Sequence, residues 1–158
     1  MKLLVVKPMN TEPKHLTFAH KPFAELTLTE LYELLWLRDI VFVVGQQITA
    51  ECEVDGHDPE CEHVIGRDAS GKIVATARLF LGKNPVKVGR VAVHTDLQRS
   101  GLGSELMAYV NGILGDRPGL MSAQAHLGPW YTRMGWQQVG DVYEEARIPH
   151  IKMIRNPS

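Results

Sequence analysis

A short glycine-containing loop is the part of the sequence with the clearest chemical potential. Gly101 and Gly103 let backbone amides approach a ligand without an intervening side chain. The amphipathic run that begins at Leu102 predicts a helix, whose first N–H groups and positive dipole end favour a phosphate. The polar residues that could add hydrogen bonds to the same anion are Gln98, Arg99, Ser100 and Ser104. We therefore interpret this loop as a diphosphate-binding site.

Two common phosphate-binding loops do not fit these residues. A Walker loop ends in Gly-Lys followed by Ser or Thr, whereas Gly103 is followed by Ser-Glu. A dinucleotide fingerprint needs a third glycine where Leu106 stands, and it belongs in a leading strand–helix–strand unit. The remaining pattern, Gln/Arg-x-x-Gly-x-Gly/Ala after an apolar strand, resembles the acyl-CoA loop of the GNAT N-acetyltransferase superfamily.

Other parts of the chain carry the same resemblance. Residues 130–136 look like the aromatic-Tyr-x-x-x-Gly-aromatic element of that superfamily. The segments that are similar to its ElaA-like branch are residues 37–46, 89–93, 123–125 and 148–151. The sequence departs from the pattern at two positions, with Arg99 where relatives usually have glycine and Gly45 where ElaA-like sequences usually have glutamate.

The resemblance implies a fold and a reaction. The fold would be the α/β GNAT fold, a mixed central sheet with helices on both faces and a splay between the strands at 86–94 and 120–126. Pantetheine enters this splay in the superfamily, so backbone groups of Val91 and Val93 would bond the thioester and the pantetheine arm. The implied cosubstrate is acetyl-CoA, no metal is expected, and the acetyl group would pass directly to an amine of a small molecule.

The resemblance also implies catalytic roles. Tyr131 stands at the position of the usual general acid toward the departing thiolate. A thiol pKa near ~8.5 and a phenol pKa near ~10 make this proton transfer uphill by about 2 kcal/mol, so hydrogen-bond donation describes the role better. His150 lies in a segment that resembles the acceptor-facing C-terminal strand, and we favour it as the base that deprotonates the amine. His63, His126 or a water molecule are the alternatives.

Charged residues suggest how an acceptor could be recognised. Arg38, Arg78 and Arg90 could bind an acceptor carboxylate, or they could be paired within the fold. Residues 51–62 contain six Asp or Glu residues and no Lys or Arg, and such a run predicts a solvated loop.

Two other functions compete with acetyl transfer. The first is an acyl-CoA-binding module without catalysis, which Gly45 and Arg99 favour and Tyr131 opposes. The second is a metal-dependent enzyme that would use Cys52, His57, Cys61 and His63. The spacing of these four residues matches no familiar zinc pattern, which argues against the metal.

Apolar periodicity and turn residues predict the elements that position these groups. A helix is expected to start at Thr27, whose Thr-x-x-Glu spacing forms a capping box, and to end near Ile40. A second helix is expected over 102–114, and a short third one starts near Pro129. The predicted strands are residues 16–20, 63–67, 73–81, 86–94, 120–126, 139–144 and 150–154.

Length and composition set the outer limits. A chain of 158 residues suits one acetyltransferase domain, predicted over 15–158 after an irregular leader over 1–14. The hydrophobic share of 44% and the charged share of 22% exclude collagen-like, coiled-coil and broadly disordered proteins. A net charge of −1 gives no sign of a nucleic-acid partner, and no apolar run suits a membrane span or a signal peptide. We expect a cytoplasmic protein, and exposed strand edges would allow a homodimer.

Overall fold

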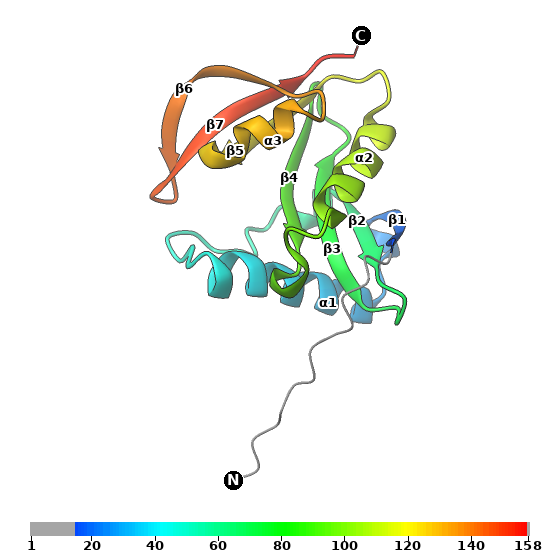
Figure 1. The fold of residues 1–158 in the computed structure, drawn as a ribbon. Helices are drawn as coiled ribbons and strands as arrows, with labels where there is room; N and C mark the ends of the chain where they lie inside the picture. Colours follow the sequence, from blue (N-terminus) through cyan, green and yellow to red (C-terminus); the bar gives the residue numbers. More distant parts are fainter. Residues whose placement is uncertain (1–14, 158) are drawn as a thin grey trace.

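The seven strands form one mixed sheet. A computed structural model describes residues 15–157, so the leader predicted for residues 1–14 lies outside the described residues. The strand order is β1-β2-β3-β4-β5-β7-β6, and all neighbours are antiparallel except the parallel pair β4 and β5 (Figure 1). The strands are β1 (Thr17–Pro22), β2 (Glu62–Arg67), β3 (Ile73–Phe80), β4 (Val86–Val93), β5 (Gly119–Gln124), β6 (Gln137–Glu145) and β7 (Ile148–Arg155).

Helices cover both faces of this sheet, as the sequence predicted. The helices are α1 (Leu28–Arg38), α2 (Leu102–Leu114) and α3 (Gly128–Thr132). Ala92 of β4 belongs to the apolar cluster of α1, whereas the next residue, Val93, belongs to the cluster of α2 and α3. Because successive strand residues face opposite sides, α1 lies on one face and α2 and α3 on the other (Figure 1). The predicted α/β GNAT architecture is confirmed.

The strands β4 and β5 separate after a very short pairing. Only Val86↔Gly119 and Lys87↔Leu120 are paired between them, although both strands continue beyond these residues. The register between β3 and β4 also shifts between Thr76 and Arg78, which places a bulge in β4. Arg90 lies in this bulge with a φ of +50°, a conformation that bends the strand. The predicted splay between the two central strands is therefore present.

Some element boundaries differ from the sequence-based prediction. α1 ends at Arg38 and continues as a π-helical segment, Asp39–Gly45, where a run of β-branched side chains crowds a regular α-helix. β5 ends at Gln124, because the next three residues form a 3₁₀ turn that leads into α3. None of the helices within residues 15–157 combines the length and the apolar character that crossing a bilayer requires.

The capping box predicted at Thr27 gives a direct test of how α1 is anchored. The Thr27 side chain accepts a hydrogen bond from the Glu30 N–H at 3.1 Å, and the Glu30 carboxylate accepts one from the Thr27 N–H at 3.1 Å. We expect Thr27→Ala to lower the free energy of unfolding by about 1 kcal/mol in urea denaturation, because the first turn of α1 loses its cap. The control is Thr29→Ala, an exposed position in the same helical turn, which should change stability far less. Equal effects of the two substitutions would contradict this account.

Candidate functional site

The glycine loop leads directly into α2, and its backbone is open to a ligand. Gly101 is the N-cap residue of α2 with a φ of +86°, and no side chain caps the helix. The first N–H groups of α2 therefore have no capping side chain within the described residues. A Cβ at Gly103 would lie 3.1 Å from the indole of Trp130, so the loop packs closely against α3. This geometry suits the close approach of an anion to the main chain.

Two side chains predicted to donate to the anion instead bond within the chain. Gln98 Nε2 donates to the carbonyl oxygen of Val93 at 3.1 Å, and Ser100 Oγ donates to the carbonyl oxygen of Leu97. These bonds hold the loop against the end of β4. Gln98 and Ser100 therefore shape the loop in this structure, whereas the side chains of Arg99 and Ser104 are exposed beside it.

The departure at Arg99 does not disturb the backbone of the loop. Arg99 has a φ of +64°, in the left-handed region that glycine adopts most easily. The chain thus keeps the conformation expected of the glycine usually found there, at some cost in backbone strain. The arginine adds a positive charge to a loop that is open to an anion.

The backbone groups of β4 that face the splay can be identified from one hydrogen bond. The N–H of His94 donates to the Val74 carbonyl of β3 at 2.8 Å. Because backbone groups alternate in direction along a regular strand, the N–H of Val93 faces away from β3. That side is the diverging edge toward β5, where β4 has no strand partner beyond Lys87. The bulge at Arg90 interrupts this alternation next to Val91. The binding roles of Val91 and Val93 toward the thioester and the pantetheine arm stay a prediction.

Tyr131 lies in the buried, apolar part of the site. Its side chain is 5% exposed and belongs to the apolar cluster that contains Val93 of β4 and Ala123 of β5. Its ring meets that of Trp130 edge to face, with the ring centroids 4.7 Å apart. Burial raises the pKa of Tyr131 to about 12, so the phenol stays protonated at neutral pH. Within residues 15–157 we find no hydrogen bond from its hydroxyl, which leaves the O–H free as a donor.

His150 lies on β7, the strand next to β5. It pairs with Gln124, and its Nδ1 lies 2.7 Å from the carbonyl oxygen of Ile148. A carbonyl can only accept, so Nδ1 carries the proton and Nε2 of the neutral ring has the lone pair. Gln124 in turn donates to Gln46, just after the π-helical segment, at 2.7 Å. This contact joins the β5 side of the splay to the end of the α1 region.

The alternative bases have other surroundings. His63 is 2% exposed, its Nε2 lies 2.9 Å from the Asp58 carbonyl, and burial lowers its pKa. His126 is exposed in the turn after β5. His63 is therefore enclosed on the α1 side of the sheet, and His126 keeps an ordinary solvated position.

The three arginines proposed for the acceptor are paired with the acidic segment. Arg38 Nε and Arg90 Nε both donate to Glu53 Oε1, at 2.6 Å and 2.8 Å. The remaining ion pairs are Arg38 with Asp58 at 2.7 Å, Arg78 with Asp58 at 3.1 Å, Arg78 with Asp55 at 2.6 Å and Arg90 with Asp55 at 3.4 Å. The interpretation of these arginines as carboxylate ligands is thus replaced by the alternative, pairing within the fold. The expectation of a freely solvated acidic loop is wrong at Glu53, Asp55 and Asp58.

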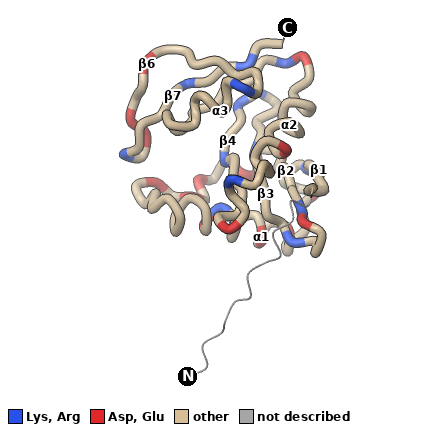
Figure 2. The backbone as a smooth tube through the Cα atoms, in the orientation of Figure 1, with Lys and Arg blue, Asp and Glu red and all other residues tan. Residues whose placement is uncertain are grey.

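Electrostatics agree with this pairing. Hydrogen bonds from Arg78 are the main cause of a pKa of Asp55 well below its ordinary value. Burial acts to raise the pKa of Asp58, but hydrogen bonds from Arg38 and Arg78 outweigh it and the pKa falls. Away from this network, Figure 2 shows acidic and basic residues interspersed along the described chain. The uneven distribution of charge is the only trace of the network in the sequence, because its partners are far apart in the chain.

The Cys/His group does not converge on one point. His57 contacts Glu60 at 2.6 Å, Cys61 donates to the His57 carbonyl at 3.3 Å, and Cys52 is exposed. Burial raises the pKa of Cys61 to about 11, which disfavours the thiolate that a metal would need. Within residues 15–157, no three His, Cys, Asp or Glu side chains are arranged to hold a metal ion.

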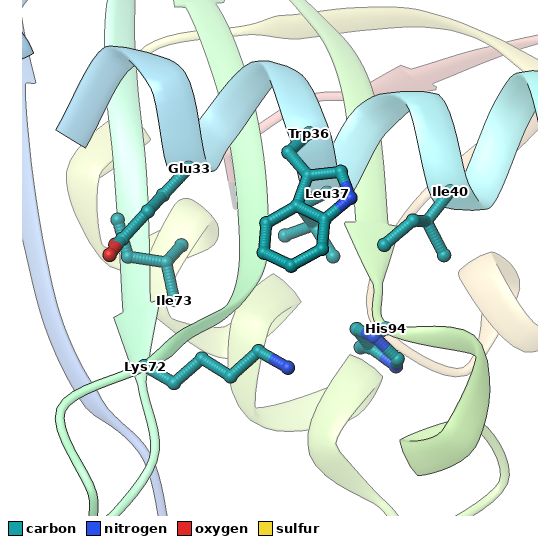
Figure 3. Close-up of a pocket in the computed structure, with 7 residues that line it drawn as sticks. All are labelled: Glu33, Trp36, Leu37, Ile40, Lys72, Ile73 and His94. Atoms are coloured by element: carbon teal, nitrogen blue, oxygen red, sulfur yellow. The ribbon is translucent and has the colours of Figure 1, made fainter. Parts of the chain in front are cut away.

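A small cavity lies on the α1 face, next to the end of β4. It has a volume of about 150 Å³ and is lined by Glu33, Trp36, Leu37, Ile40, Lys72, Ile73 and His94 (Figure 3). The Lys72 ammonium lies 5.8 Å from the centroid of the Trp36 ring. A cavity of roughly this volume holds a molecule the size of benzene, so it does not accommodate an acyl carrier.

Comparison with known proteins agrees with the geometry. The family described as "Acetyltransferase (GNAT) domain" matches residues 43–156. ElaA of Escherichia coli is 37% identical over 141 residues, covering 84% of this chain and 91% of ElaA; its crystal structure has a TM-score of 0.80. A UPF0039 protein of Schizosaccharomyces pombe is 37% identical over 145 residues, covering 88% of this chain and 96% of that protein. An acyl-CoA N-acyltransferase structure from Pseudomonas aeruginosa has a TM-score of 0.79 at 39% identity, covering 89% of this chain and 99% of that one.

The shared carboxylate of Glu53 tests the arginine network. Glu53→Gln keeps the shape but removes the charge that faces Arg38, whose side chain is 2% exposed. We expect a loss of about 1–3 kcal/mol in the free energy of unfolding, measured in urea, because charge-assisted hydrogen bonds are lost in a buried setting. Glu51→Gln, at an exposed position of the same loop, is the matched control. A Glu53→Gln protein as stable as this control would show that the network contributes nothing.

Proposed function

The chain belongs to the GNAT acetyltransferase family, in its ElaA-like branch, and we propose that it transfers an acetyl group from acetyl-CoA directly to an amine of a small molecule. The observation that carries the proposal is the combination of the splay with the uncapped start of α2. The splay leaves an edge of β4 unpaired, and the start of α2 offers N–H groups to an anion. An acyl carrier that ends in a diphosphate needs both.

The residues that would hold acetyl-CoA are supplied by β4 and the glycine loop. N–H groups at the start of α2 would bind the diphosphate, with Arg99 and Ser104 adjacent. The free edge of β4 at Val91 and Val93 would bond the pantetheine arm and the thioester carbonyl. A preorganised N–H at a developing oxyanion lowers the barrier of acyl transfer by roughly 3 kcal/mol. The thioester itself supplies the activated acetyl group.

Tyr131 would stabilise the departing thiolate. With its pKa raised to about 12, full proton transfer to a thiol of pKa ~8.5 is uphill by about 5 kcal/mol. This is a larger barrier than the ordinary phenol value predicts. Tyr131 is therefore a hydrogen-bond donor to the sulfur, and the proton that completes free CoA comes from solvent.

His150 would accept the proton of the acceptor. An alkylammonium has a pKa of ~10.4, so the amine must lose a proton before its nitrogen can attack. The Ile148 carbonyl fixes the proton of the neutral ring on Nδ1 and leaves the Nε2 lone pair available. The new C–N bond then forms as the C–S bond breaks.

Binding of acyl-CoA without turnover is the second candidate function. Gly45 favours it, because a side chain there would meet the Ile40 carbonyl at 3.0 Å and Thr95 at 3.2 Å, and the glutamate usual in the branch is absent. Release of CoA, followed with a thiol reagent over a panel of amines, separates the two functions. Acetyl-CoA binding with no release on any amine would favour this second candidate.

Gly101 tests the placement of the diphosphate. We expect Gly101→Val to raise the Kd for acetyl-CoA about tenfold, which corresponds to ~1.4 kcal/mol, because a β-branched side chain blocks the main chain and resists a φ of +86°. Calorimetric titration measures the affinity, and circular dichroism checks the fold. Gly112→Val is the control, in the last turn of α2 and far from its N-terminus, with no atom within 4 Å of its Cβ position. Unchanged affinity in Gly101→Val would mean that the diphosphate lies elsewhere.

Tyr131 tests the chemical step. Tyr131→Phe should lower kcat about tenfold to hundredfold, because a hydrogen bond to a charged sulfur is worth about 1.5–3 kcal/mol. The Kd for acetyl-CoA should stay nearly constant, since the ring and its packing are kept. The control is Tyr109→Phe, whose hydroxyl bonds His20 at 2.8 Å on the outer side of α2. Full turnover in Tyr131→Phe would remove this residue from the mechanism.

A further inference from the structure

A group of polar side chains lies on the sheet face opposite α3. We call it the C-terminal polar cluster: Ser122 of β5, Tyr143 and Glu145 of β6, and His150 of β7. Tyr143 pairs with His150 in register, and their rings are stacked with centroids 6.3 Å apart. The adjacent residues Ala123 and Ile151 are buried in the α2 and α3 core instead. The cluster therefore occupies the other face of the same three strands.

The hydrogen bonds of the cluster lack one donor. Nε2 of His150 lies 3.4 Å from Oε2 of Glu145. The Nδ1 proton of the ring is directed to the Ile148 carbonyl at 2.7 Å, so a neutral His150 presents a lone pair to a carboxylate oxygen. Two acceptors that face each other are stable only when a proton or a cationic donor lies between them.

The other members of the cluster do not supply that donor. Ser122 Oγ donates to Glu145 Oε2 at 3.0 Å, which uses its only proton. Tyr143 OH then donates to Ser122 Oγ. Lys152 lies on the same face, but it is exposed, and no ion pair joins it to Glu145 within residues 15–157. Among the described residues, the only ion pair of Glu145 is therefore the one with His150, and it requires a protonated ring.

The cluster lies beside the splay. His150 pairs directly with Gln124, the last residue of β5, and Gln124 reaches Gln46 at 2.7 Å. Tyr131 belongs to the opposite, apolar side of the same strands. An acceptor bound by Glu145 and His150 would therefore approach the splay from one face of the sheet. Tyr131, which would stabilise the leaving sulfur, lies on the other face.

We infer that Glu145 and His150 bind the acceptor as a protonated aliphatic amine, an inference that rests on the proposed acetyl transfer. The ammonium supplies the donors that the pair lacks. One of its protons passes to Nε2 of His150, and Glu145 stabilises the resulting imidazolium. The freed nitrogen pair forms the C–N bond as the C–S bond breaks and CoA leaves as the thiolate; the acylated nitrogen then loses its second proton to solvent. The arginines do not oppose this assignment, because Glu53, Asp55 and Asp58 already neutralise them.

The acceptor class that fits is an alkylamine. An arylamine is uncharged at neutral pH and brings no cation to Glu145. Among the described carboxylates of β6, the neighbouring Glu144 gives a matched comparison. It pairs with Pro149, one residue out of phase with Glu145, so its side chain faces the other side of the sheet.

Glu145→Gln, with Glu144→Gln as its control, tests the inference. The probes are 1,4-diaminobutane as the cationic acceptor and aniline as the neutral one, both assayed by CoA release with acetyl-CoA saturating. We expect Glu145→Gln to raise the KM for the diamine about tenfold or more, because a charge-assisted hydrogen bond is lost. The value of kcat at saturating diamine should fall as well, because Glu145 no longer stabilises the imidazolium of His150, whereas the Kd for acetyl-CoA should change little. Glu144→Gln should match the unmodified protein throughout.

A binding measurement separates this inference from the proposed function. The diamine is titrated calorimetrically into the protein saturated with CoA, which needs no turnover. Diamine binding that Glu145→Gln loses supports the inference even if the unmodified protein releases no CoA, and in that case only the proposed transfer fails. Diamine binding and KM that are unchanged in Glu145→Gln, a preference for aniline, or no diamine binding at all would each overturn the inference.

Discussion

The site depends on the early end of pairing between β4 and β5. Parallel strands that stop pairing after Lys87 leave the remaining N–H and C=O groups of β4 without a sheet partner on that side. Unpaired backbone groups near a core are costly unless water or a ligand satisfies them. An extended, amide-containing carrier arm satisfies them as an additional strand would. In the proposed function, the divergence would thus make a binding site from the same hydrogen-bonding requirement that holds the rest of the sheet together.

The arginine network explains how this divergence is kept fixed. Arg90 lies in the β4 bulge with a φ of +50°, and its guanidinium is held by Glu53 at 2.8 Å. Glu53 is held in turn by the buried Arg38. A buried ion pair contributes little net stability once desolvation is counted, but it favours one geometry strongly. The acidic segment therefore acts on the site indirectly, by holding the bulge that turns β4 away from β5.

Local patterns predicted the local structure well. The observed bounds of α2 agree with those predicted from the sequence, because glycines directly beside the helix, Gly101 and Gly115, determine where it starts and ends. The capping box at Thr27 is equally local. The Glu53 network and the C-terminal polar cluster were missed because their members meet only through strand register and bulges. The pairing of Tyr143–Glu145 with Ile148–His150 is regular, but the strands predicted from the sequence, 139–144 and 150–154, stopped short of the turn that joins them and so did not place Glu145 beside His150.

The two faces of the β5–β7 half of the sheet differ in polarity in a way that suits two opposite charge changes. On the α3 side, burial keeps Tyr131 protonated with a pKa of about 12, and an anion that develops there meets a fixed O–H donor and little water. On the other side, Glu145 is 46% exposed and can accept a hydrated cation without the full cost of desolvation. A reaction that consumes an ammonium on one side and produces a thiolate on the other would use both environments. Exchanging the two faces would leave an ammonium in the apolar cluster and a thiolate beside a carboxylate, which is unfavourable on both counts.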